Sequence, residues 1–139
     1  MLTTSFELLH KAGACEERYR HLAKALGGIK KYGRATPIPL WRGLDTNGLD
    51  DTLWALRAVM PGQEAEREKL ARLFACWCAR QVWHLLTDER SRTAVEVAER
   101  YAVGEATDEE LDAAGVAPWD AAGVAQTAHL RKMLGGDDE

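Results

Sequence analysis

Cys76 and Cys78 have the residue types and the spacing that come closest to a metal or redox site. Two thiolates that approach one ion are typical zinc ligands. The surrounding residues 64–86 carry a helical apolar pattern, however, and residues two apart on a helix point about 200° away from each other. His84, the nearest histidine, also lies off the helical face of Cys78. We therefore expect structural thiols and predict no metal ion and no cofactor.

The four histidines form no recognisable catalytic pair. None has a Glu or His partner at the spacing of a metal-binding motif such as H-E-x-x-H. Asp88 follows His84 by four residues, as an orienting carboxylate follows a base, but a contact at a helix end explains this pair equally well. Asp45, Asp50 and Asp51 crowd one stretch, where acids at helix starts have the same pattern. We therefore predict a protein that is not an enzyme.

A basic segment bracketed by glycines covers residues 29–35. Lys30, Lys31 and Arg34 surround Tyr32, which we expect to be an exposed aromatic residue. Such a segment can bind phosphate oxygens or an acidic protein surface, and a solvated turn between helices has the same composition. Nothing like a helix-turn-helix recognition helix follows, so sequence-specific DNA binding is not expected.

Five tryptophans are many for 139 residues. Trp77 belongs to the apolar stripe of its helix, whereas Trp83 and Trp119 are expected to be partly exposed. Exposed tryptophans on a rigid helix often anchor protein interfaces, although a second core face would give the same pattern. Acids from Glu105 to Asp112 could face a basic surface of a partner. The predicted partner-binding residues are Lys30, Lys31, Tyr32, Arg34, Trp83, Glu109, Glu110 and Trp119.

The elements that position these residues are helices. Ala, Leu, Glu and Arg dominate the long segments, and Thr107 with Glu110 forms a capping box before one of them. Glycine and proline pairs separate the segments. We predict an all-α fold, a single irregular bundle of about six or seven helices over residues 1–139 with an acidic tail at 136–139. The expected helices are 5–26, 37–45, 50–59, 64–86, 89–102, 107–115 and 118–134.

Composition and charge narrow the setting of the chain. Hydrophobic residues make up 46% and charged residues 29%, as in a folded globule. Three cysteines suit reduced thiols, and the sequence shows neither a signal peptide nor about 20 consecutive apolar residues, so we expect a cytoplasmic protein without a membrane segment. Residues 1–42 hold eight Lys and Arg against three Glu, whereas residues 43–139 hold ten basic and nineteen acidic residues. This imbalance can steer partners electrostatically.

Four stretches of the sequence resemble a diffuse family of bacterial and phage helical proteins, some of which are labelled as immunity proteins. They are NGLDDTLWALRAV at 47–59, LFACWCAR at 73–80, HLLTDERSRTAVEVAERYA at 84–102 and ATDEEL at 106–111. The similarity covers roughly residues 40–115. It implies a helical interaction scaffold in the cytoplasm of a bacterial host, and it implies no active site. Small phage and mobile-element proteins of this kind include inhibitors of bacterial defence systems, such as anti-CRISPR proteins.

The leading hypothesis is therefore a non-enzymatic inhibitor, encoded by a phage or mobile element, that binds a subunit of a bacterial defence complex of the CRISPR-Cas type. An immunity protein that neutralises a cognate toxin is the first alternative. The second is an accessory protein that binds nucleic acid through the basic residues of segment 24–42, which are Lys24, Lys30, Lys31, Arg34 and Arg42.

Overall fold

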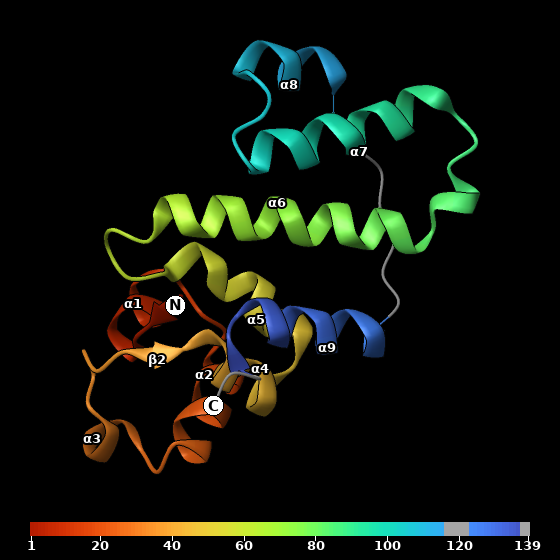
Figure 1. The fold of residues 1–139 in the computed structure, drawn as a ribbon. Coiled ribbons are helices and arrows are strands. Elements are labelled where there is room, and N and C mark those ends of the chain that lie inside the picture. The colour runs from red at the N-terminus through yellow and green to blue at the C-terminus, as the bar shows by residue number, and fades with distance from the viewer. Residues whose placement is uncertain (116–122, 137–139) are drawn as a thin grey trace. The chain divides into compact units, whose positions relative to one another are not determined.

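Helices dominate the chain in a computed structural model that describes residues 1–115 and 123–136 (Figure 1). This confirms the predicted α class. The described residues form nine α-helices, two 3-10 helices and one pair of two-residue strands. The chain divides into two compact units, unit 1 with residues 1–67 and 123–139 and unit 2 with residues 68–122. One domain over the whole chain stays a prediction, and each unit is described by itself.

Unit 1 contains β1 (Thr3–Thr4), α1 (Phe6–Lys11), α2 (Glu16–Ala25), α3 (Ile29–Tyr32), β2 (Ile38–Pro39), α4 (Leu40–Asn47), α5 (Leu49–Ala55), η1 (Leu56–Ala58) and α9 (Gly123–Met133). Unit 2 contains most of α6 (Glu64–Gln81), then η2 (Trp83–Leu85), α7 (Glu89–Ala102) and α8 (Asp108–Ala114). No helix in the described ranges is long and apolar enough to span a membrane.

A short strand pair holds the N-terminus of unit 1 in place. β1 pairs with β2 in antiparallel register, with Thr3 opposite Pro39 and Thr4 opposite Ile38. The buried hydroxyl of Thr4 donates to the carbonyl of Ala58 at 2.5 Å, so this polar side chain has a hydrogen-bond partner in the core. Two stretches far apart in sequence are thereby joined next to the start of α1.

The core of unit 1 forms around Phe6, which has no exposed surface. The rings of Tyr19 and Tyr32 meet Phe6 edge-on, with ring centroids 5.6 and 5.9 Å away. Such edge-to-face pairs add about 0.5–1.5 kcal/mol each beyond the burial of apolar surface. The other buried members of this cluster are Leu9, Leu22, Leu26, Ile38 and Ala58.

Three predicted helix boundaries are wrong. The expected helix 5–26 is broken into α1 and α2, because Gly13 adopts a φ of 88° that a continuous helix does not allow. The expected helix 37–45 begins with the strand residues Ile38–Pro39 and becomes helical only from Leu40 to Asn47. The expected helix 64–86 ends at Gln81 and continues as η2. The break at Gly13 adds one α-helix, and α3 adds another within the basic segment 29–35, where the sequence predicts no helix. These two account for nine described α-helices where six or seven are predicted.

The C-terminal helix completes unit 1. Figure 1 shows α9, drawn in blue, beside α4 and α5, against which it packs. Leu130 is 0% exposed and Leu134, just after the helix, is 3% exposed. Arg131 in α9 donates to both carboxylate oxygens of Asp45 in α4, from Nε to Oδ1 at 2.8 Å and from Nη2 to Oδ2 at 3.1 Å. Buried apolar side chains and this ion pair thus hold α9 against α4.

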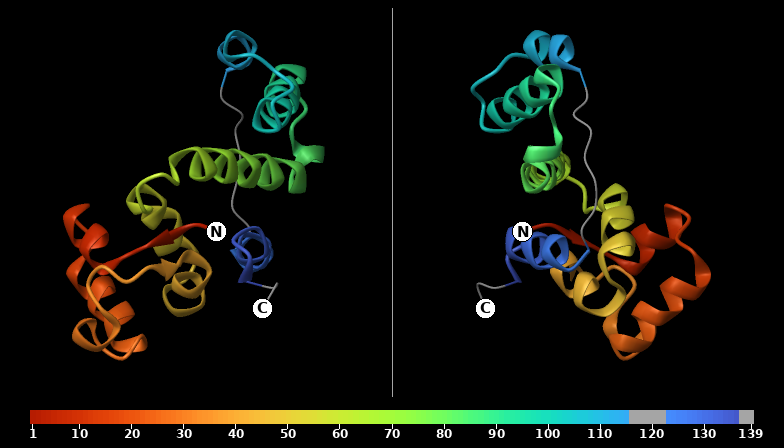
Figure 2. Two further views of the ribbon diagram at one scale, coloured as in Figure 1. Left: turned by 60° about the vertical axis from the view of Figure 1, so that its left-hand side comes forward. Right: turned by 90° about the vertical axis from the view of Figure 1, so that its right-hand side faces the viewer.

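Unit 2 contains the helix starts that the sequence predicts best. Asp88 caps α7 by accepting a hydrogen bond from the amide of Arg90 at 3.0 Å, and Thr107 with Glu110 forms the predicted capping box of α8. α8 packs on α7, as both views in Figure 2 show. A small core of Cys76, Ala79 and Val95 joins α6 to α7.

Candidate functional site: a pocket in unit 1

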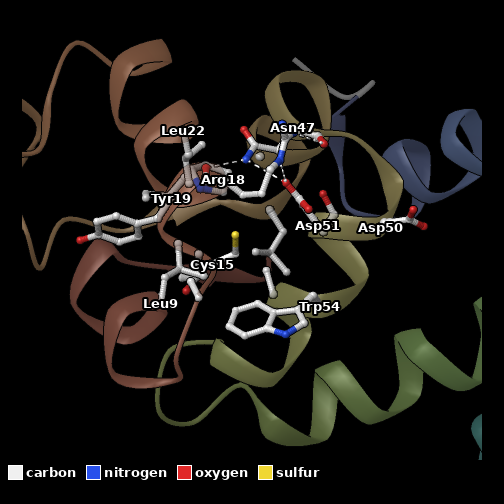
Figure 3. A pocket seen from close by; sticks show the side chains of 17 residues that line it. Leu9, Cys15, Arg18, Tyr19, Leu22, Asn47, Asp50, Asp51 and Trp54 are labelled. Carbon is white, nitrogen blue, oxygen red and sulfur yellow. Dashed lines mark hydrogen bonds and ion pairs between the residues drawn. The ribbon is translucent and has the colours of Figure 1, made fainter.

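A pocket of about 290 Å³ opens between the helices of unit 1 (Figure 3). It is neither a closed cavity nor a flat surface, so a group from solution can enter it. Its walls come from β1, α1, α2, β2, α4 and α5 together with the turn before α2. The lining residues are Thr4, Leu9, Ala14, Cys15, Arg18, Tyr19, Leu22, Ile38, Pro39, Leu40, Gly43, Asn47, Asp50, Asp51, Thr52, Trp54 and Ala55.

Most of the pocket wall is apolar. Leu9, Leu22 and Ile38 belong to the core cluster, and Trp54 packs against that cluster while it is only half-buried. The pocket is therefore an indentation of the core rather than a gap between loops. Pockets of this kind, mostly apolar with a few polar groups, are the usual binding sites of small molecules and of anchoring side chains.

One wall carries a polar network. Arg18 on α2 donates from Nε to Asp51 Oδ2 at 2.7 Å and from Nη2 to the carbonyl of Asn47 at 3.1 Å (Figure 3). The Asn47 side-chain amide donates to the Arg18 carbonyl at 3.0 Å and to the same Asp51 oxygen at 3.1 Å. The hydrogen bond from Arg18 to Asp51 raises the pKa of Arg18 above its ordinary value, so the guanidinium stays charged. The network fixes α2 against the junction of α4 and α5.

Cys15 places an exposed free thiol in the pocket wall, at the start of α2. Figure 3 shows its sulfur among the lining side chains. Cys76 and Cys78 are buried thiols, and burial raises the pKa of Cys76 to about 11. Because the thiolate is the reactive form, a thiol reagent at neutral pH reacts first with Cys15. This difference makes Cys15 a reporter of what fills the pocket.

Gly43 lies inside α4 and also lines the pocket. It is not among the glycines with positive φ, and a Cβ built on it meets no atom within 4 Å. A side chain at this position is therefore compatible with the helix and has free space beside it. Substitution of Gly43 therefore adds side-chain bulk at the pocket lining without strain in the backbone.

The predicted basic segment lies in unit 1 but outside the pocket lining. Lys30 and Lys31 are exposed on α3, and Arg34 is exposed just after it. Tyr32 is half-buried rather than exposed, because its ring packs on Phe6 and its hydroxyl donates to the carbonyl of Pro37 at 2.9 Å. The expectation of an exposed aromatic residue here is wrong, since Tyr32 holds α3 against the core.

Trp83 in η2 of unit 2 is half-buried, as the sequence predicts. It packs against the core of Cys76, Ala79 and Val95. The guanidinium carbons of Arg80 and Arg92 lie 4.0 and 5.2 Å from its ring centroid. Cation–π contacts of this kind stabilise the unit and already occupy part of the indole surface.

Glu109 and Glu110 are both exposed on α8, which is separated in the sequence from Trp83 by α7. Glu110 has two structural roles, because it closes the capping box and pairs with Arg100 at 3.2 Å. The backbone hydrogen bond from Thr107 and then the Arg100 guanidinium lower the pKa of Glu110. Trp119 lies outside the described residues. The predicted binding residues are thus distributed over two units, and none of those described lines the pocket.

Sequence reasoning missed the pocket because its parts are distant in the chain. Arg18 and Asp51 are 33 positions apart, and no local pattern pairs them. The sequence predicts Asp51 to be a helix-start acid, and it does lie in the first turn of α5. A search for an unexplained basic residue inside an apolar helical pattern would have selected Arg18, but not its partner.

The pocket can bind an apolar group, and Cys15 places one thiol in its lining. Among the described residues, no three His, Cys, Asp or Glu side chains gather closely enough to hold a metal ion. No family model matches the chain, and neither a curated protein nor a solved structure matches it.

Proposed function

We propose that the chain is a non-enzymatic protein that binds another protein stoichiometrically, and that the pocket of unit 1 receives an apolar side chain of that partner. The observation that carries this proposal is the preformed apolar pocket, with the charged network of Arg18 and Asp51 on one wall. Protein interfaces gain most of their affinity from a few large side chains that enter such pockets, while polar groups at the rim fix the orientation.

The size of the pocket supports an anchor of one side chain. A volume of about 290 Å³ lies near the lower end of the roughly 300–1,000 Å³ range of small-molecule pockets. This is enough for one indole, phenyl or branched aliphatic group, whose full burial contributes about 1.5–3 kcal/mol. Association of two proteins costs more than this, so the partner must also contact the surface around the pocket.

The identity of the partner is a finer proposal. The sequence resemblance favours a subunit of a bacterial defence complex of the CRISPR-Cas type, blocked by a phage or mobile-element inhibitor, with a cognate toxin as the alternative. In either case, the partner would lose a surface that it needs for nucleic acid or for assembly. The pocket fits both partners equally, and identification of the captured protein distinguishes them.

A matched pair of Gly43 variants tests the proposal. Gly43→Leu adds a side chain beside the pocket, whereas Gly43→Ala adds only the first carbon at the same helical position. Tagged wild type, Gly43→Ala and Gly43→Leu are used to capture proteins from the lysate of the bacterium that carries the sequence, with quantification by mass spectrometry. We expect wild type and Gly43→Ala to retain one partner at a near-stoichiometric level, and Gly43→Leu to lose most of it.

Alkylation of Cys15 provides an independent block of the same pocket. Wild type treated with a bulky maleimide should lose the partner, and a Cys15→Ser variant given the same treatment should keep it, because the other thiols are buried. If the partner is captured equally by the Leu variant and by the alkylated protein, the pocket is not the anchor site. Capture of no stoichiometric protein by wild type would refute partner binding itself.

Binding of nucleic acid is the second candidate, favoured by one observation. Three basic residues are exposed within five positions, Lys30 and Lys31 on α3 and Arg34 just after Gly33. If these residues contact phosphates, the wild type retards DNA or RNA in a gel at low salt, and Lys30→Gln with Lys31→Gln lowers the salt dependence of binding. Absence of any retardation at low salt would remove this candidate.

A further inference from the structure

We infer that the pocket selects a partner segment in which an aromatic or branched aliphatic side chain stands next to a lysine or arginine. This inference rests on the proposed function, because it specifies the chemistry of the segment that enters the pocket. The size and the apolar lining of the pocket select the side chain that enters it. The charges at the rim of the pocket select the residue next to that side chain in the partner segment.

The charged lining of the pocket has an excess of negative charge. It contains Arg18, Asp50 and Asp51, and the Arg18 charge is neutralised by Asp51 at 2.7 Å. Asp50 is exposed and has no hydrogen bond or ion pair among the described residues. Figure 3 shows its side chain directed away from Cys15 and Asp51, so its carboxylate lies at the outer edge of the lining, where a residue beside the inserted group can pair with it. Glu17, the exposed neighbour of Arg18 on α2, adds a further negative charge close to this wall.

Arg57, which follows α5, is a cation near this wall, but it is already engaged. Its guanidinium carbon lies 4.6 Å from the centre of the Trp54 ring, and its Nε donates to the Trp54 carbonyl at 2.9 Å. It does not line the pocket. The negative face of an aromatic ring attracts cations, so the ring of Tyr19 in the lining also favours a positively charged neighbour.

An acidic segment fits this rim poorly. To pair with Arg18, a carboxylate would have to displace Asp51, whose Oδ2 accepts hydrogen bonds from both Arg18 and Asn47. Displacement would leave two carboxylates of the lining without a cation. A basic neighbour avoids this cost, because it pairs with Asp50 while the existing network stays intact.

Three synthetic peptides test this selectivity: acetyl-Gly-Trp-Lys-Gly-amide and the same sequence with Gln or Glu in place of Lys. Binding is measured as protection of Cys15 from N-ethylmaleimide, a neutral reagent, over a peptide concentration series with detection by mass spectrometry. One added charge pair at about 6 Å in water changes affinity about threefold. We expect the Lys peptide to protect at about one third of the concentration that the Gln peptide needs, and the Glu peptide to be weakest.

Two variants of exposed carboxylates show where the selectivity arises. Asp50→Asn should bring the Lys and Gln peptides to about equal protection, whereas Glu7→Gln, on α1 outside the pocket lining, should retain the threefold difference. Circular dichroism checks that both variants keep the helical content of the wild type. Tryptamine is measured in parallel as a free amine of similar apolar size.

The outcomes separate this inference from the proposed function. The inference is supported if the Lys peptide protects Cys15 best and the Glu peptide least in both wild type and Glu7→Gln. The same result requires that Asp50→Asn lose the difference between the Lys and Gln peptides. Equal protection by all three peptides overturns the charge selectivity and leaves the pocket as an apolar anchor site. Failure of every tryptophan peptide to protect Cys15 overturns the inference of a basic segment, whereas the proposed function is overturned by the failure of wild type to capture a stoichiometric partner. If tryptamine protects at a lower concentration than the Lys peptide does, the occupant is a small amine and the partner-segment inference is wrong.

Discussion

Leu130→Ala tests whether α9 is part of the core of unit 1. Leu130 is 0% exposed, on a helix that packs on α4 and α5. The substitution removes three carbons, which cost about 2.4 kcal/mol of transfer free energy at about 0.8 kcal/mol for each CH₂ group. The cavity that remains adds to this loss, and measured Leu→Ala changes in cores span about 2–5 kcal/mol. We expect the free energy of unfolding to fall by about 3 kcal/mol, near the middle of that range.

The assay is urea unfolding followed by far-ultraviolet circular dichroism. With a slope of roughly 2 kcal/mol per molar urea, a loss of about 3 kcal/mol lowers the midpoint by about 1.5 M. Leu85→Ala is the matched control, because it makes the same chemical change at a leucine that is 67% exposed. Surface substitutions of this kind change stability by only about 0.5 kcal/mol.

Equal midpoints for Leu130→Ala and Leu85→Ala would refute the reasoning, because α9 would then contribute nothing to the core. A second measurement locates the effect. Hydrogen exchange should increase in α4, whose Asp45 binds the neighbouring Arg131. If exchange increases only within α9 itself, the helix frays without supporting α4.

Two further predictions concern unit 2. Thr107→Ala removes the hydroxyl that accepts a hydrogen bond from the Glu110 amide at 3.1 Å, and it should lower the stability of α8 by about 1 kcal/mol. Hydrogen exchange in α8 should become faster, and unchanged exchange would mean that the cap contributes nothing. Burial raises the pKa of Cys76 from 9.0 to about 11, so above pH 9 the unfolded chain loses this proton before the folded chain does. The free energy of unfolding should therefore fall between pH 9 and 11, by up to about 1.4 kcal/mol per pH unit, and the fall should be smaller in Cys76→Ala; identical pH profiles would contradict this.

Local chemistry explains which parts of the fold the sequence predicts. The start of α7 at Asp88 and the capping box at Thr107 are confirmed, because a helix start depends on residues within one turn. The broken helix 5–26 shows the limit of apolar spacing. Gly13 lies inside a pattern that continues on both sides of it, and its positive φ depends on how α1 and α2 pack.

The pocket depends on contacts that no local pattern contains. Arg18 and Asp51 each have an ordinary local interpretation, one as a helix residue and the other as a helix-start acid. Their hydrogen bond exists only because α2 packs beside the junction of α4 and α5. The predicted partner residues are charged or expected to be exposed, whereas the pocket is lined mainly by residues that sequence patterns assign to the core. Tyr32 shows the reverse error, since an aromatic residue among lysines is packed on Phe6.

The position of α4 links the stability of unit 1 to its proposed function. The pocket lining includes three residues of α4, which are Leu40, Gly43 and Asn47. Asp45 on the same helix binds Arg131 of α9. A change in α9 can therefore alter the pocket without any contact between α9 and a partner. Loss of partner binding in Leu130→Ala would not place α9 in the interface. Gly43→Leu is more informative, because it changes the pocket at a position where the structure has open space and leaves the contact of α4 with α9 in place.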